Sequence, residues 1–200
     1  MNKYIMIGPQ GAGKGTQSIL LSQTFGFVHI SIGEIFRWHV DNHTKLGSRV
    51  TRITAQGRLV SDEIVEQVVR ERLELHDWRH GFVLDGFPRT PSQASYLFEN
   101  WNLDRAIYLD LPDAAVSQRV LKRAQAGQGG GFTKRADDNP EALQHRLSEY
   151  HLKTRPLLKL FEERGLLLRV NASRSIDEVF GAVCAGLGLT EPVADRRSAA

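Results

Sequence analysis

Residues 8–16, with the sequence GPQGAGKGT, carry the clearest chemical pattern in the chain. The spacing of their glycines before Lys14 matches Gly-x-x-x-x-Gly-Lys, which is typical of loops that bind phosphate groups. Glycine lets the backbone curl so that successive N–H groups face one anion, and a following helix adds a partial positive charge at its N-terminus. Lys14 can then reach the outer phosphates. The alternative interpretation is an ordinary tight turn between a strand and a helix.

The residues on both sides of this loop favour phosphate binding. An apolar run at 4–7 precedes the loop, and apolar residues at 19–21 indicate a helix after it. A hydroxyl group that binds Mg²⁺ is expected directly after the lysine of such a loop. Gly15 stands at that position, and Thr16 supplies the available hydroxyl one residue later.

A second candidate for binding Mg²⁺ is Asp85, which ends the apolar run 82–84. In proteins with a phosphate-binding loop, a carboxylate at the end of a buried strand holds Mg²⁺ directly or through a water molecule. The alternative is that Asp85 serves only as a turn or capping residue.

Six arginines lie beside glycine turns or helix ends rather than in one charged block. They are Arg37, Arg89, Arg119, Arg123, Arg135 and Arg146. Because a guanidinium group pairs with two phosphate oxygens at once, such a set suits a site that holds two phosphorylated ligands. Taken singly, each arginine also fits a solvated helix face with surface ion pairs.

Residues 127–131, with the sequence GQGGG, lie between Arg123 and Arg135. A segment of this composition cannot bury much surface and is flexible. It fits either a plain loop or a hinged lid. Transfer of a phosphoryl group to an acceptor other than water requires that water be excluded, which gives a lid a purpose.

The composition predicts one compact domain. The chain has 200 residues, 41% of them apolar, and a formal net charge of +3 without a long Lys/Arg run, so we expect no nucleic-acid partner. Cys184 is the single cysteine, which excludes an internal disulfide and a cysteine zinc site, and the seven histidines show no metal-binding spacing. Without a signal-peptide pattern or an apolar run of about 20 residues, we expect a cytoplasmic chain with no membrane contact.

Short apolar segments alternate with helical patterns along the chain. The predicted strands are 3–7, 28–30, 82–84, 106–109 and 166–170. Because these segments lack apolar–polar alternation and helices separate them, we predict an α/β fold with a five-stranded parallel sheet covered by helices on both faces. Ligands then bind at the carboxyl ends of the strands. A long helix should begin at Asp138 or Asn139, and Pro156 should kink it.

Taken together, these motifs resemble those of adenylate kinases, within the nucleoside-monophosphate kinase family. The matching segments, in the family's order and spacing, are 8–17, 31–37, 57–60, 85–90 and 135–138. The resemblance extends over about residues 3–187, and Gly15 is the family's residue at its position. It implies a three-layer P-loop NTPase fold and the Mg²⁺-dependent, reversible reaction of ATP with AMP to give two ADP.

The resemblance also implies a role for each site residue. Those that would bind ATP are Gly11, Ala12, Gly13, Lys14, Gly15, Thr16, Arg119, Arg123 and Arg174. Those that would bind AMP are Ile32, Arg37, Arg58, Leu59, Val60, Gly86, Phe87, Pro88, Arg89, Gln93, Arg135 and Arg146. Those that would act on the transferring phosphoryl group are Lys14, Arg89, Arg123, Arg135 and Arg146. Thr16 and Asp85 would hold Mg²⁺, the carboxylate through water, and no zinc site is expected.

The implied organisation is a single domain over 1–188 with a tail at 189–200. Within the domain, 31–60 would be a mobile segment that binds the monophosphate, and 124–134 would be a lid of the family's short form. A monomer is expected, with ATP, AMP and ADP as its ligands.

One residue departs from the family's pattern. Adenylate kinases usually carry threonine where this chain has Ile32, which cannot form a hydrogen bond to the acceptor base. Gln93 still favours AMP, although its local sequence alone makes it a capping-box residue. UMP, CMP or a broad range of acceptors is therefore the second hypothesis. A nucleotide-binding switch is a third, but it would not need two sets of phosphate-binding arginines.

Overall fold

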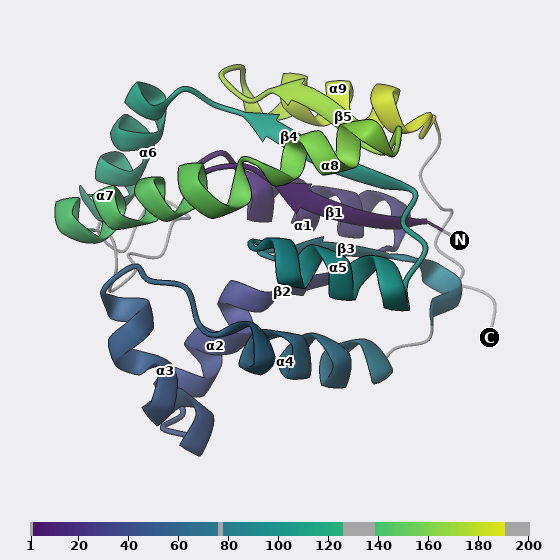
Figure 1. Cartoon of the computed structure of the whole chain (residues 1–200). Coiled ribbons are helices and arrows are strands. Elements are labelled where there is room, and N and C mark those ends of the chain that lie inside the picture. The colour runs from purple at the N-terminus through teal and green to yellow at the C-terminus, as the bar shows by residue number, and fades with distance from the viewer. Residues whose placement is uncertain (1, 76–77, 126–138, 191–200) are drawn as a thin grey trace.

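The chain folds around one parallel β-sheet, seen in a computed structural model that describes residues 2–75, 78–125 and 139–190 (Figure 1). The five strands are β1 (Lys3–Ile7), β2 (Val28–Ser31), β3 (Phe82–Asp85), β4 (Arg105–Asp110) and β5 (Leu167–Asn171). Their order in the sheet is β2-β3-β1-β4-β5, and every neighbouring pair is parallel. The predicted fold is therefore confirmed, with strand ends within one or two residues of those expected.

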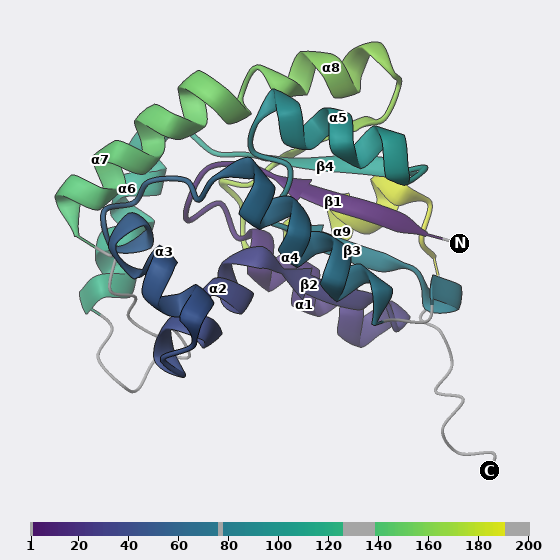
Figure 2. The same cartoon turned by 60° about the horizontal axis from the view of Figure 1, so that its bottom comes forward.

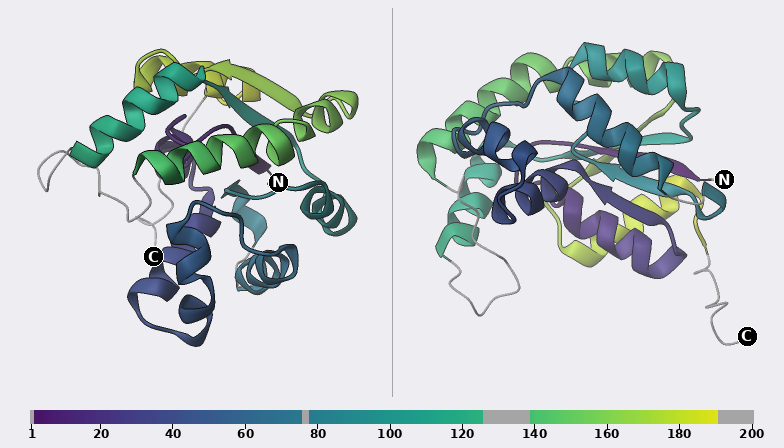
Figure 3. Two further views of the ribbon diagram at one scale, coloured as in Figure 1. Left: turned by 60° about the vertical axis from the view of Figure 1, so that its left-hand side comes forward. Right: turned by 90° about the horizontal axis from the view of Figure 1, so that it is seen from below.

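Both faces of the sheet are buried, because alternate side chains of each strand point to opposite sides. Ile5 and Ile7 join one apolar cluster, and Tyr4 and Met6 join another. The first cluster includes side chains of α4 (Asp62–Glu74), α5 (Pro91–Asn100) and α8 (Leu157–Glu163). The second includes side chains of α1 (Lys14–Phe25), α6 (Asp113–Gln125) and α9 (Ile176–Leu187). The result is three layers, with helices on the two sides of the sheet (Figures 2 and 3).

The carboxyl ends of the strands lie at one edge of the sheet. In register, Asp85 at the end of β3 lies beside Met6 of β1 and Ser31 of β2. These ends point to the left in Figure 1, the side on which α3, α6 and α7 lie. The loops that follow the strands, and the helix N-termini after them, therefore share one edge of the molecule.

Helices α2 (Ile32–Asp41) and α3 (Lys45–Ala55) project from this edge, below the sheet in the left view of Figure 3. The Ser31 side chain accepts a hydrogen bond from the Glu34 N–H and so caps α2. Phe36 and Val50 carry the first apolar cluster into this pair of helices. The residues from 31 to 60 are thus attached to the main core and not a separate globule.

A third group of helices crosses the same edge. After α7 (Pro140–Glu149) comes a π-helical turn, η2 (Tyr150–Thr154), and α8 begins only beyond Pro156. The sequence predicted a kink at Pro156, and the regular α-helix is interrupted between residues 150 and 156, where proline cannot supply the N–H of an α-helical bond. Asn139, one of the two residues predicted to cap α7, accepts a hydrogen bond from the Ala142 N–H.

Some predicted features differ or lie beyond the described residues. A serine directly before a helix favours a side-chain cap. Ser61, which precedes α4, forms no such bond within the part of the chain that the structure describes. The predicted lid at 124–134 lies outside the described residues from 126 onward, and the tail does so from 191 onward. In the described ranges, no helix is both long enough and apolar enough to cross a bilayer.

Gly47 allows α2 and α3 to approach each other closely. A Cβ atom at this position would overlap the carbonyl oxygen of His39 and lie 2.8 Å from the backbone nitrogen of Val40. We expect Gly47→Ala to lower the free energy of unfolding by about 1–3 kcal/mol, because backbone must move to relieve the overlap. Chemical denaturation followed by circular dichroism measures this change.

The matched control is Gly181→Ala, also within a helix. A Cβ at Gly181 meets no described atom within 4 Å. This substitution should leave stability unchanged or raise it by about 0.5–1 kcal/mol, because alanine favours helix. Equal losses in the two variants would contradict the role assigned to Gly47.

Candidate active site

The loop between β1 and α1 curls as a phosphate-binding loop must. Gly8 has φ 152° and Gly13 has φ 95°, values that a residue with a side chain rarely adopts. A Cβ at Gly8 would also lie 2.8 Å from the carbonyl oxygen of Leu109, so the loop packs closely on the end of β4. The loop leads directly into the first turn of α1, whose N–H groups have no partner within the helix. This is an anion-binding arrangement.

Lys14 places its positive charge over this loop. Its Nζ donates hydrogen bonds to the carbonyl oxygens of Gly8, at 2.8 Å, and Pro9, at 2.9 Å. The ammonium group therefore lies against the loop that was predicted to bind phosphate. An anion held by the loop would meet both the lysine and the helix N-terminus.

Asp85 stands beside the loop at the end of β3. Its Oδ2 atom lies 3.7 Å from the position that a Cβ of Gly15 would take. Its Oδ1 atom is buried and has no hydrogen-bond partner among the described residues. An unpartnered carboxylate oxygen next to a phosphate-binding loop fits a hydrated cation as its missing partner.

Arg37 and Arg89 converge on a second anion-binding place. A Cβ at Gly33 would lie 3.1 Å from Nη1 of Arg37, and a Cβ at Gly86 would lie 3.0 Å from Nη2 of Arg89 and 3.7 Å from the Gly33 nitrogen. The two guanidinium groups thus lie beside two glycines that are close to each other. Gly33 belongs to the first turn of α2, which adds the N-terminus of a helix to this place.

A partly buried hydrogen-bond network holds the backbone of Arg89. Asp62 accepts hydrogen bonds from Nε2 of Gln93, at 2.7 Å, and from Oγ1 of Thr90, at 2.9 Å. The Oε1 atom of Gln93 accepts from the backbone N–H of Arg89, at 2.7 Å. Thr90 caps α5 as predicted, but the second half of the predicted capping box differs, because the Gln93 side chain reaches Arg89 rather than Thr90. The sequence did not identify Asp62 as a site residue. The only signal was its position two residues after the predicted monophosphate-binding segment, 31–60.

Arg119 is held between the loop and the turn after β5. Its Nη2 donates to the carbonyl oxygen of Ala172 at 2.7 Å, and its Nη1 donates to that of Gly11 at 3.4 Å. These bonds fix the plane of the guanidinium group beside the phosphate-binding loop. Arg174, also predicted to bind ATP, lies two residues beyond Ala172 along the chain.

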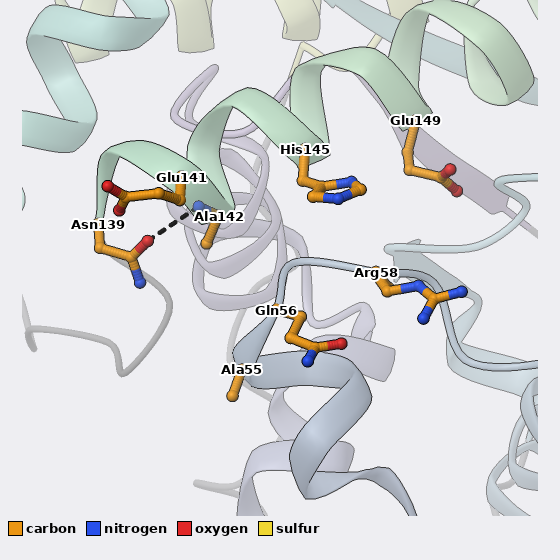
Figure 4. Close-up of a pocket in the computed structure, with 8 residues that line it drawn as sticks. All are labelled: Ala55, Gln56, Arg58, Asn139, Glu141, Ala142, His145 and Glu149. Carbon is orange, nitrogen blue, oxygen red and sulfur yellow. Dashed lines mark hydrogen bonds between the residues drawn. The ribbon is translucent and has the colours of Figure 1, made fainter.

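Helix α7 packs against the turn that follows α3. A Cβ at Gly57 would lie 2.5 Å from the carbonyl oxygen of Ala142 and 3.1 Å from Cγ of Arg146, so the turn after α3 touches α7. A cavity of about 570 Å³ lies between them. Figure 4 shows its lining residues: Ala55, Gln56, Arg58, Asn139, Glu141, Ala142, His145 and Glu149. Of these, only Arg58 was predicted; the spacing of Glu141, His145 and Glu149, four residues apart on one face of α7, was a signal that the sequence analysis did not use.

The remaining predicted residues divide into three groups. Val60 and Phe87 are buried in the first apolar cluster, as is Ile32, which is only 2% exposed. Arg123 lies on α6 one turn after Arg119, with its side chain outside the described part of the structure. Arg135 lies entirely outside the described residues. The structure therefore places Lys14, Asp85 and Arg119 around the phosphate-binding loop, and Arg37 and Arg89 beside the neighbouring Gly33 and Gly86, while Arg146 lies against the turn at Gly57.

The fold and the site define a class of protein. A phosphate-binding loop on a parallel sheet, beside a second anion site lined by arginines, is the arrangement of a P-loop kinase that acts on a phosphorylated acceptor. Comparison with known families is specific: the model of the family described as adenylate kinase matches residues 6–166. The chain belongs to the adenylate kinase family, whose members are phosphotransferases.

Individual relatives agree along almost the whole chain. An adenylate kinase of Bifidobacterium longum is 40% identical over 190 residues, which cover 92% of this chain and 99% of that protein. One from Agrobacterium fabrum is 40% identical over 186 residues, covering 90% and 95%. One from Nitrobacter winogradskyi is 41% identical over 182 residues, covering 88% of each chain. The family resemblance inferred from the motifs is confirmed.

The Asp62 network makes a prediction about stability. In Asp62→Ala, the Gln93 amide and the Thr90 hydroxyl lose a common acceptor, and we expect the free energy of unfolding to fall by about 1–3 kcal/mol. Urea denaturation measures the change. The adjacent Ser61→Ala is the control and should shift stability by less than about 0.5 kcal/mol, as surface substitutions do. An unchanged Asp62→Ala protein would mean that the network does not contribute to stability.

Proposed function

We propose that this chain catalyses the reversible transfer of the γ-phosphoryl group of ATP to AMP, giving two ADP. One observation carries the proposal. Asp85 faces the phosphate-binding loop, and the next residue, Gly86, faces the guanidinium group of Arg89 near Arg37 and the start of α2. Two anion sites thus adjoin each other across a single peptide unit. A site for one nucleotide alone would not require the second.

The reaction then needs no nucleophile from the protein. An oxygen of the acceptor phosphate forms a bond to the γ-phosphorus while the bond from that phosphorus to the β,γ-bridging oxygen breaks, leaving ADP on each side. Lys14 and Arg89 neutralise charge on the transferring group and align the two ligands. Arg123, Arg135 and Arg146 complete this set as residues proposed from the family's pattern.

We assign Mg²⁺ to Asp85 and Thr16. The unpartnered Oδ1 atom of Asp85 supports this, and Thr16 lies in the first turn of α1, next to Gly15. The ion would neutralise the phosphate charge of ATP. We expect Asp85→Asn to raise the Mg²⁺ concentration for half-maximal activity at least about tenfold, because a neutral amide attracts a cation less than a carboxylate does. A magnesium titration of activity that superimposes on that of the wild type would contradict the assignment.

AMP is the proposed acceptor, with Gln93 reading its base. The Gln93 amide uses one N–H and one oxygen lone pair within the protein, which leaves one N–H and one lone pair for a base. Ile32 offers an apolar contact only, so the pocket has one hydrogen-bonding side chain fewer than is usual in the family. UMP, CMP or several acceptors is the alternative that this difference supports.

The wider description rests on the family and the composition. Residues 31–60 are proposed as the segment that closes on the monophosphate, and 124–134 as the lid that excludes water. We infer a monomer that acts in the cytoplasm, without a membrane or nucleic-acid partner.

The test is ADP formation from ATP with AMP, GMP, CMP, UMP and dTMP, for the wild type and for Arg89→Ala. We expect AMP to be used best, and kcat/KM for AMP to fall by about 10³-fold or more in the variant, as for other arginines at transferring phosphoryl groups. Near-normal activity of Arg89→Ala would overturn the proposed site. Hydrolysis of ATP that does not depend on any monophosphate would favour a nucleotide switch instead.

A further inference from the structure

The π-helical turn η2 carries a side chain that reaches the acceptor site. Thr154, its last residue, is only 7% exposed, and its hydroxyl donates a hydrogen bond of 2.9 Å to the carbonyl oxygen of Arg89. The two residues are 65 positions apart, so the contact is purely tertiary. No motif in the sequence pointed to Thr154.

Arg89 is held by side chains at both of its backbone polar groups. Its N–H donates to Oε1 of Gln93, and its carbonyl accepts from Thr154. A third bond joins its own Nε to the carbonyl oxygen of Gly86, at 2.9 Å. These contacts come from α5, η2 and the loop itself. Together they set the direction in which the guanidinium group leaves the backbone.

The π-turn lies shortly before Pro156. Proline has no N–H to continue the α-helical ladder, and the N–H of Arg155 bonds instead to the carbonyl of Tyr150, five residues back, at 2.7 Å. Tyr150 and Thr154 both face inward, being 8% and 7% exposed, while Leu152 between them is 70% exposed. The wider turn thus presents two hydroxyl groups to the interior, of which one meets Tyr108 and the other Arg89.

We propose that Thr154 is a positioning residue that holds Arg89 in place for the acceptor phosphate and thereby joins the helix carrying Arg146 to the acceptor site. This rests on the role proposed above for Arg89. If Thr154 only satisfied a buried carbonyl, its loss would lower stability and leave the use of AMP unchanged. Positioning of Arg89 instead predicts a selective change in AMP kinetics.

The test compares three substitutions at this position. Thr154→Val keeps the shape and removes the hydroxyl; we expect kcat/KM for AMP to fall about three- to tenfold, the effect of one hydrogen bond, with KM for ATP within about twofold of the wild type. Thr154→Ser keeps the hydroxyl and should restore AMP kinetics to nearly wild-type values. Thr154→Cys, a weak donor, should lie between them, and this series keeps the proposal testable if the valine variant does not fold.

Tyr150→Phe is the matched control. It removes the other inward hydroxyl of the same turn, which bonds Tyr108 at 3.4 Å and has no recorded bond to Arg89 among the described residues. AMP kinetics should stay unchanged in this variant. Equal losses in Tyr150→Phe and Thr154→Val, or an unchanged KM and kcat for AMP in Thr154→Val, would overturn the proposal.

A double variant separates this inference from the proposed function. In Arg89→Ala, adding Thr154→Val should cause little further loss in kcat/KM for AMP, because the group that Thr154 positions is already absent. A fully additive loss would contradict positioning. If Arg89→Ala itself keeps normal activity, the proposed function is wrong. If Arg89→Ala loses activity but the Thr154 variants keep the wild-type kcat/KM for AMP, only the role proposed for Thr154 is wrong.

Discussion

Repulsion between two phosphate chains is the constraint on which this structure depends. At about 4 Å, two like unit charges in a protein of effective dielectric constant 20 repel by roughly 4 kcal/mol. Positive groups must therefore be gathered at one place. The parallel sheet does this by bringing every strand's carboxyl end, and so the N-termini of α1 and α2, to one edge. Fixed N–H dipoles, Lys14, Arg37 and Arg89 then lie at the edge where the two anions would meet in the proposed reaction.

The two halves of the proposed site, for the phosphoryl donor and for the acceptor, are built in different ways. The donor half is local: nine consecutive residues form the loop and the first turn of α1, and few distant contacts are needed beyond those of Leu109 and Arg119. The acceptor half is distributed. Arg37 comes from α2, and Arg89 from the loop after β3, while Arg146 comes from α7. Its geometry therefore depends on how several helices pack around that edge.

That packing explains why so many buried polar groups surround Arg89. A loop residue is held accurately only if its N–H and C=O groups have fixed partners, and burial makes each missing partner costly. Gln93 and Thr154 provide these partners from α5 and η2, and Asp62, at the start of α4, in turn accepts a hydrogen bond from Gln93. Close approaches at Gly47 and Gly57 bring α2 against α3, and the turn after α3 against α7. Ile32, buried in the apolar cluster, belongs to the same packing as well as to the proposed base pocket.

The sequence by itself determined the sheet, the phosphate-binding loop and the family, because strand apolarity, glycine spacing and capping residues act over a few neighbouring positions. Asp85 and Arg89 were identified the same way. Only the tertiary structure decided that Gln93 bonds the Arg89 N–H, that Asp62 orients Gln93, and that Thr154 bonds the Arg89 carbonyl. Those partners lie up to 65 residues apart along the chain. Their pairing follows from the packing of helices that are distant in sequence. The proline predicted a break in the helix, but not which side chains the turn before it would direct to the interior.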